Sequence, residues 1–174
     1  MIRKIISAIV LVGGIVALDI LTKAWAFEAL THGFSVTGPA GVPLTLAFNQ
    51  GIAFGVPIPS AGRWIIIFAT LLVLFVLSTM FLTARPRDWN RLLAVQLVGA
   101  GAIGNLIDRV RWDRGVVDFI GPIQVGSVQW PIFNIADMAI TTGAILLAYS
   151  LLRDETVATA KAGGETLEMD RMTT

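Results

Sequence analysis

Two aspartates lack a nearby basic residue that could neutralise them. No Lys or Arg lies within three positions of Asp118 or of Asp137, and Asp118 stands in the apolar run Val116-Val117-Asp118-Phe119. An ionised side chain in a bilayer is costly, by about 2.5–3.5 kcal/mol at the centre of an inserted helix. A chain that is sparing with charge is therefore expected to keep these two carboxylates for a function.

The chemistry open to such a pair is the activation of water. Two carboxylates that converge in a medium of low dielectric constant cannot both ionise cheaply, so one of them holds a proton. The ionised member can take a proton from water while the protonated member donates to the carbonyl under attack. This chemistry needs no metal and no cofactor. The chain has no cysteine and a single histidine, His32, which excludes a thiol nucleophile and a Cys/His zinc site.

Further polar side chains recur at helical spacing, which places them on shared helix faces. They form three groups: Asp19 with Thr22 and Lys23, Asn105 with Asp108 and Arg109, and Asn134 with Asp137. If successive helices alternate in direction across the bilayer, these groups and Asp118 lie at one level on one side of the membrane. That coincidence is the strongest functional signal in the residues themselves.

A purely structural role competes for several of these residues. Asp19 and Lys23 are spaced for a simple intrahelical ion pair, and Asp108 with Arg109 or Arg111 is suited to anchor a helix end. We favour the structural interpretation for these pairs. The asparagines near the same helix ends can also cap helices or bridge them by hydrogen bonds.

Four stretches are long and apolar enough to position these groups as membrane-spanning helices. The 174 residues are 55% hydrophobic and 14% charged, against about 25% charged in typical soluble domains, and a span takes about 20 mostly apolar residues. We predict one membrane domain at 1–153, with spans at about 5–27, 64–84, 91–109 and 132–152, and a polar cytoplasmic tail at 154–174. The third span is rich in small residues that permit close helix contacts, so we place it at the centre of the bundle.

The flanking charges and the remaining segments complete the predicted fold. Basic residues precede the first span, separate the second from the third and follow the fourth, which places both termini in the cytoplasm.

Leu44, Leu46 and Phe48 alternate within 42–54 as on a half-buried strand, and 116–133 is a second apolar stretch. We predict an all-α integral membrane protein, a four-transmembrane-helix bundle with a small β-rich extracytoplasmic subdomain. Irregular loops packed on the bundle are an equal alternative for the latter.

Charge and repeat patterns narrow the classes of function. The net charge is +1 and the basic residues are scattered, so nucleic acid is not an expected partner. A small proton-coupled transporter would also place carboxylates in a bundle, but usually near the midplane and with repeated or broken helices. A scaffold whose polar clusters only hold helices together is a third possibility.

The sequence resembles the bacterial lipoprotein signal peptidases, the signal peptidase II family, along nearly the whole chain up to Arg153. Five strings in order carry the resemblance: D-I-L-T-K at 19–23, N-Q-G-I-A-F at 49–54, G-N-L-I-D-R at 104–109, V-V-D-F at 116–119 and F-N-I-A-D at 133–137. The resemblance implies an aspartic endopeptidase of the bacterial inner membrane. Its substrates would be diacylglyceryl-modified prolipoproteins, cut just before the lipidated Cys. We expect contact with membrane lipid and a monomeric enzyme.

The resemblance also implies roles for individual residues. It assigns the catalytic dyad to Asp118 and Asp137. Residues expected to surround the site or bind substrate are Asp19, Lys23, Asn49, Gly51, Asn105, Asp108, Arg109 and Asn134. Met138 stands where the family usually has Ser, which is expected to alter the hydrogen bonding of Asp137 without abolishing activity.

Overall fold

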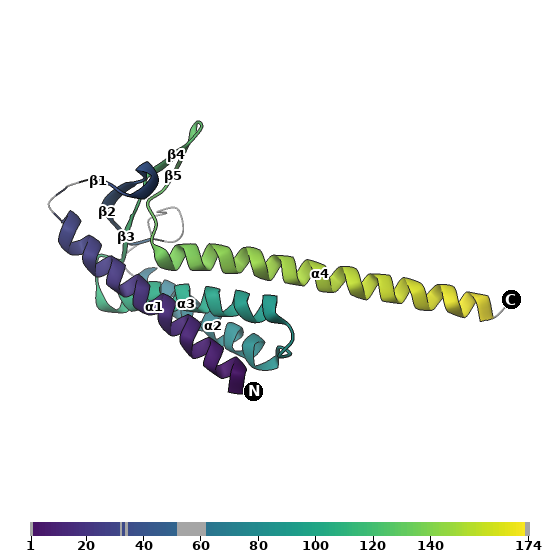
Figure 1. Cartoon of the computed structure of the whole chain (residues 1–174). Coiled ribbons are helices and arrows are strands. Elements are labelled where there is room, and N and C mark those ends of the chain that lie inside the picture. Colours follow the sequence, from purple (N-terminus) through teal and green to yellow (C-terminus); the bar gives the residue numbers. More distant parts are fainter. Residues whose placement is uncertain (1, 32, 34, 52–61, 173–174) are drawn as a thin grey trace.

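Four long helices dominate the computed structural model, which describes residues 2–31, 33, 35–51 and 62–172, with side chains up to residue 153. The helices are α1 (Ile2–Leu30), α2 (Gly62–Thr83), α3 (Trp89–Arg111) and α4 (Ile135–Met172) (Figure 1). Each contains a stretch that is long and apolar enough to cross a membrane. The predicted four-span helical membrane fold is therefore confirmed, and the predicted span boundaries stay a prediction.

Helix α3 is the centre of the bundle, as its small residues predict. Half of its apolar stretch is buried within the protein, against 6% for α1. A side chain on Gly101 would collide with the carbonyl oxygen of Ala136 in α4, and one on Gly143 of α4 would come within 2.8 Å of the carbonyl oxygen of Ala94. The two helix backbones therefore approach so closely that only glycine fits at these points.

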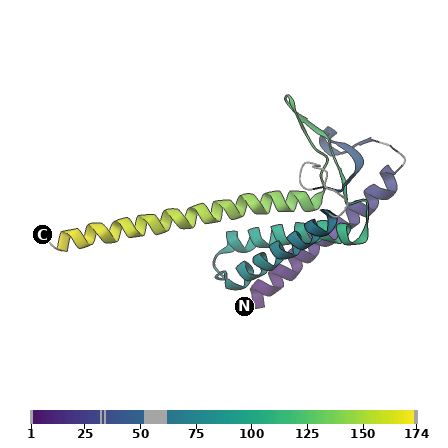
Figure 2. The same ribbon diagram turned by 180° about the vertical axis from the view of Figure 1, so that it is seen from behind.

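Helix α4 differs from the prediction at both of its ends. It begins at Ile135, and it continues as helix to Met172 through the residues predicted to form a polar tail. Figures 1 and 2 show α4 extending well beyond the other three helices, with both chain ends on the side away from the strands. The division of the chain after residue 153 stays a prediction.

A small antiparallel sheet lies at one end of the bundle. Its strands β1 (Val36–Thr37), β2 (Pro43–Asn49) and β3 (Val116–Ile120) are ordered β1-β2-β3, and β4 (Ile123–Val125) pairs with β5 (Val128–Trp130) in a separate hairpin (Figure 1). This confirms the β-rich region over irregular loops. The predicted strand within 42–54 ends at Asn49, and residues 52–54 lie outside the described part of the chain, as does His32.

Strand β3 is covered on both faces. Val116, Val117 and Phe119 are each at most 4% exposed, and Phe119 packs with Ala26 and Leu30 of α1. Because successive side chains in a strand point to opposite faces, this packing turns the intervening Asp118 the other way. The strand thus anchors Asp118 against the helix ends.

Candidate active site

One asparagine, Asn134, joins the two predicted catalytic aspartates. Its side-chain nitrogen donates to Oδ1 of Asp118 (2.7 Å). Its Oδ1 accepts from the backbone N–H of Asp137 (2.9 Å), and the carboxylate of Asp137 accepts from the backbone N–H of Asn134 (3.2 Å). These reciprocal bonds form a capping box at the start of α4. The turn that begins the helix therefore fixes Asp137 beside Asp118.

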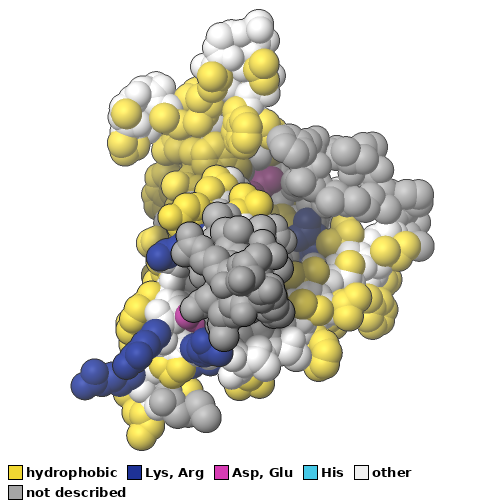
Figure 3. All heavy atoms as spheres, turned by 90° about the vertical axis from the view of Figure 1, so that its right-hand side faces the viewer, with side chains coloured by type: hydrophobic (Ala, Val, Ile, Leu, Met, Phe, Trp, Pro, Cys, Tyr) yellow, Lys and Arg dark blue, Asp and Glu magenta, His cyan; other side chains and the backbone are white. Residues whose placement is uncertain are grey.

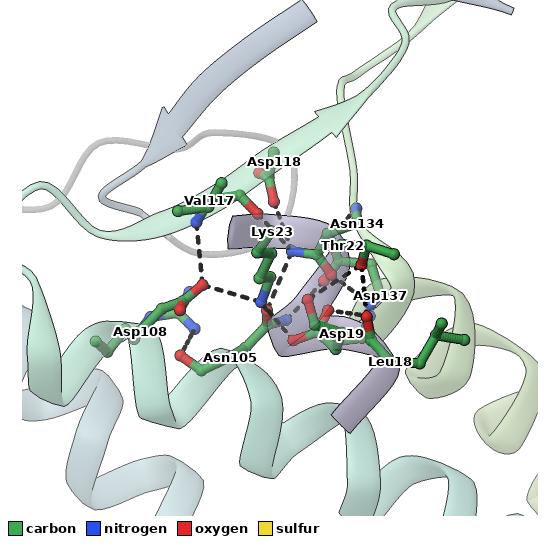
Figure 4. A network of polar contacts seen from close by, with 12 residues as sticks. Leu18, Asp19, Thr22, Lys23, Asn105, Asp108, Val117, Asp118, Asn134 and Asp137 are labelled. Carbon is green, nitrogen blue, oxygen red and sulfur yellow. Dashed lines mark hydrogen bonds and ion pairs between the residues drawn. The ribbon is translucent and has the colours of Figure 1, made fainter. Parts of the chain in front are cut away.

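Helix α3 supplies a second amide to the same cluster. Nδ2 of Asn105 donates to Oδ1 of Asp137 (2.8 Å), and Oδ1 of Asn105 accepts from Asn134 (3.1 Å) and from Nζ of Lys23 (3.0 Å). Figure 4 shows these side chains converging from α1, α3 and α4 beneath strand β3. The site is therefore assembled from four elements, of which α1 is distant in the sequence from α3, β3 and α4.

Asp19, Lys23 and Asp108 form an ion cluster next to the side-chain amides of Asn105 and Asn134. Nζ of Lys23 lies 2.7 Å from Asp19 and 2.9 Å from Asp108, and all three residues are at most 7% exposed. The predicted pairing of Asp19 with Lys23 is correct. The predicted pairing of Asp108 with Arg109 or Arg111 is wrong, because Asp108 turns inward to Lys23 and to the backbone N–H of Val117 (3.1 Å).

Gly104 leaves room for Asp19 in this cluster because it has no side chain. A Cβ on Gly104 would lie 2.5 Å from Oδ2 of Asp19. The other oxygen of Asp19 accepts from the backbone N–H of Ala136 (2.9 Å), in the first turn of α4. Asp19 thereby connects α1 to α4 across α3.

The remaining predicted residues line the side of the site nearest β2. Nη2 of Arg109 donates to the carbonyl oxygen of Gly51 (3.0 Å), and the N–H of Gly51 donates to Oδ1 of Asn49 (3.0 Å). Arg109 also contacts the backbone oxygen of Asn105 (3.4 Å). All ten predicted site residues therefore belong to one connected set of polar contacts.

Burial makes Asp118 a poor place for a negative charge. The residue is 3% exposed, and burial raises the pKa of its carboxyl from the ordinary value of 3.8 to about 7, with the charge of Asp137 acting in the same direction. Hydrogen bonding by Asn134 and the positive charge of Lys23 oppose the shift. Asp118 is thus suited to hold a proton near neutral pH.

A groove of about 950 Å³ leads from the membrane-facing helices to the aspartates. Its walls are mostly apolar side chains of α2, α3 and α4, and its polar end is formed by Asn105, Arg109, Asp118 and Asp137. Figure 3, a view toward the C-terminal end of α4, shows hydrophobic side chains over much of the coloured surface. The groove therefore connects an apolar surface between the helices to the polar side chains of the site.

Met138 lies on the wall of this groove and not within the hydrogen-bond network. Its side chain is 50% exposed, and its backbone N–H donates to the backbone oxygen of Asn134 (3.3 Å). The hydrogen bonds to the carboxylate of Asp137 come from Asn105 and Asn134. The expected effect of Met138 on that bonding stays a prediction.

Three groups that hold the site were not predicted. Two are backbone N–H groups, of Val117 and Ala136, which no residue type reveals. The third is Arg63 at the start of α2, which donates to the carbonyl oxygens of Arg109 (2.6 Å) and Val110 (3.0 Å) at the end of α3. A lone basic residue in a predicted outer segment was the signal that could have identified Arg63.

The two carboxyl groups of the site have different surroundings, an arrangement suited to acid–base chemistry. Within the described residues, no group of three or more His, Cys, Asp or Glu side chains is placed to hold a metal ion. One buried carboxyl suited to carry a proton lies beside a second carboxylate that accepts two hydrogen bonds. That asymmetry is what acid–base activation of water requires.

Two solved structures of bacterial membrane enzymes, obtained by the in meso method at 2.3 and 1.9 Å resolution, have similar folds. The first shares 33% identity at a TM-score of 0.73, covering 86% of this chain and 89% of the other. The second shares 32% identity at the same TM-score, covering 85% and 94%. The fold and the site thus define a multi-pass bacterial membrane enzyme.

Sequence relatives narrow this class. A profile of the family described as Signal peptidase (SPase) II matches residues 11–153. A lipoprotein signal peptidase of Hydrogenovibrio crunogenus is 40% identical over 139 residues, covering 78% of this chain and 79% of the relative. One of Burkholderia mallei is 36% identical over 147 residues, covering 80% and 83%. This chain belongs to the signal peptidase II family, and it is a peptidase.

Proposed function

We propose that this peptidase is an aspartic endopeptidase that removes signal peptides from diacylglyceryl-modified prolipoproteins, cutting just before the lipidated Cys. The similar proteins of Hydrogenovibrio and Burkholderia are lipoprotein signal peptidases, which supports the substrate class. The observation that carries the proposed mechanism is the junction of Asp118 and Asp137 through Asn134 at the polar end of an apolar groove.

The two carboxyl groups have different proposed roles. Asp137, whose carboxylate accepts hydrogen bonds from Asn105 and from the backbone of Asn134, serves as the base in this proposal. Asp118, whose pKa is raised by burial, serves as the acid. Asp137 takes a proton from water, the water oxygen bonds to the scissile carbonyl carbon, and Asp118 gives its proton to the carbonyl oxygen.

The tetrahedral intermediate then breaks down by the reverse transfers. The protonated Asp137 donates to the leaving amide nitrogen as the C–N bond breaks, and the hydroxyl of the intermediate returns its proton to Asp118. Both carboxyl groups regain their starting states, and the products are a carboxylic acid and an amine. The reaction consumes one peptide bond and one water molecule.

The proposed position of the site in the membrane follows from the substrate. Acyl chains on the Cys keep the scissile bond near the membrane surface, and the apolar signal peptide would occupy the groove between the helices. We place the site near the outer face of the inner membrane, with both termini in the cytoplasm, membrane lipid around the bundle and the enzyme acting as a monomer.

The first experiment compares cleavage of a purified diacylglyceryl-prolipoprotein by wild type, Asp118→Asn and Asp137→Asn in detergent with a chelator present. We expect cleavage by wild type and a loss of at least about a thousandfold in both variants, since each removes a proton-transfer group. Asp88→Asn, in the exposed turn before α3, is the matched control and should cleave normally. Full activity in either dyad variant would overturn the mechanism, and a folded but inactive wild type would overturn the substrate assignment.

A further inference from the structure

We propose that Lys23 is a positioning residue of the active site, which holds the side-chain amide of Asn105 so that its NH₂ group faces Asp137. This inference rests on the proposed function and adds to it a residue that touches neither aspartate of the dyad. It follows from the three contacts of one buried ammonium group and from the two distinct ends of one amide.

The contacts of Lys23 use the full hydrogen-bonding capacity of its ammonium group. It is 4% exposed, and Nζ contacts Asp19 (2.7 Å), Asp108 (2.9 Å) and Oδ1 of Asn105 (3.0 Å). An ammonium has three N–H donors and no acceptor, so these contacts use its full capacity. Only an oxygen of Asn105 can therefore face Lys23.

The orientation of the Asn105 amide then determines what reaches Asp137. With Oδ1 held by Lys23 and by Nδ2 of Asn134 (3.1 Å), the NH₂ end of Asn105 points to Oδ1 of Asp137 (2.8 Å). A flipped amide would set NH₂ against the ammonium and against the NH₂ of Asn134, and an oxygen against the carboxylate of Asp137. All three contacts would become unfavourable in a buried site.

The same amide oxygen also orients the second aspartate. Asn134 donates from one nitrogen to Oδ1 of Asn105 (3.1 Å) and to Oδ1 of Asp118 (2.7 Å). Lys23 therefore biases both carboxyl groups of the dyad through a single acceptor, Oδ1 of Asn105; Figure 4 shows these residues together. Losing this bias should alter the proton distribution between Asp118 and Asp137 and not only the stability of the bundle.

Ionisable groups from α1, α3, β3 and α4 contact this amide or one of its direct partners. They are Asp19 and Lys23 of α1, Asp108 and Arg109 of α3, Asp118 of β3 and Asp137 of α4. Lys23 alone among them contacts the amide oxygen of Asn105 through a side-chain donor. A change in the pH profile on altering Lys23 is therefore attributable to that contact only if it depends on Asn105.

The test is a double-mutant cycle of Lys23→Met and Asn105→Ala, with kcat and KM for prolipoprotein cleavage measured from pH 5 to pH 9. Each single variant should lower kcat by about tenfold to a hundredfold, the effect of losing a hydrogen bond to a charged group. KM should change little, and the acidic limb of the kcat profile should move to higher pH. Lys23→Met should then add little in the Asn105→Ala background.

Two further variants separate positioning from folding. Lys23→Arg keeps a donor at the amide oxygen and should retain more activity than Lys23→Met. If Lys23→Met does not fold, adding Asp19→Asn removes a carboxylate that Lys23→Met leaves unpaired. Thr22→Val is the control, since within the described residues this hydroxyl bonds to its own helix, at the backbone oxygens of Leu18 and Asp19. Multiplicative losses in the cycle, or an unchanged pH profile, would overturn this inference. Loss of activity in Asp118→Asn and Asp137→Asn would still leave the proposed function intact.

Discussion

Asn134 is fully buried and contacts both aspartates, the Asn105 amide and the carbonyl oxygen of Val117 (3.3 Å). An asparagine suits this position because it has two donors and an acceptor on one planar group. An aspartate would lose the donors to Asp118, and a leucine would leave several buried groups unpaired. The two carboxyl groups thus differ through the burial of Asp118 and through the different hydrogen-bond donors that each of them meets.

The raised pKa of Asp118 predicts how stability depends on pH. Because the folded state raises this pKa from 3.8 to about 7, the folded protein binds the proton more tightly than the unfolded chain does. Its contribution is fully present below pH 3.8 and is lost as pH rises to about 7. The side chain introduced by Asp118→Asn cannot titrate. The melting temperature of the variant minus that of wild type should therefore be larger at pH 8 than at pH 5.

Thermal unfolding in detergent, followed by tryptophan fluorescence, checks this expectation. Asp88→Asn is again the control, because it should leave the difference between the two pH values unchanged. If the melting temperatures of Asp118→Asn and wild type differ by the same amount at pH 5 and at pH 8, burial does not shift the proton affinity of Asp118.

At the scale of elements, the close contact of α3 with α4 sets the geometry of the dyad. A Cβ on Gly101 would collide with the carbonyl oxygen of Ala136, directly before Asp137. Gly101→Ala should therefore separate the helices, destabilise the protein by about 1–3 kcal/mol through overpacking and reduce cleavage. Melting temperature and kcat are the measurements.

The same helix provides the control for that substitution. A Cβ on Gly99 would meet no neighbouring group within 4 Å, so Gly99→Ala should be neutral or slightly stabilising through helix propensity. If Gly101→Ala and Gly99→Ala behave alike, the close approach of α3 and α4 does not limit the activity.

The elements themselves were largely predictable from the sequence, whereas their partners were not. Long apolar runs and the alternation at Leu44, Leu46 and Phe48 depend on local patterns, which sequence carries directly. The turn of Asp108 toward Lys23, away from the adjacent Arg109, depends on how α1 packs against α3. The contacts of Asp19 with Ala136 and of Arg63 with α3 depend on backbone groups, which have no signature in residue type.

At the scale of the whole molecule, the proposed orientation can be tested by labelling. The chain has no cysteine, so a single introduced Cys reports one position. Ser127→Cys, in the exposed turn between β4 and β5, should react with a membrane-impermeant maleimide on spheroplasts. Asp88→Cys, in the turn between α2 and α3, should react only after the membrane is opened. The reverse pattern would invert the proposed topology.

The ion pair between Asp19 and Lys23 has a consequence for biogenesis. Both residues belong to α1 and lie one turn apart, with 2.7 Å between their charged groups. Helix α1 is synthesised before α3 and α4, so if the helices insert in chain order it enters the lipid before Asp108, Asn105 and the start of α4 are available. Because the pair neutralises itself within a single helix, the translocon meets a segment with almost no net charge at that level. The charges that later organise the active site can thus be inserted one helix at a time.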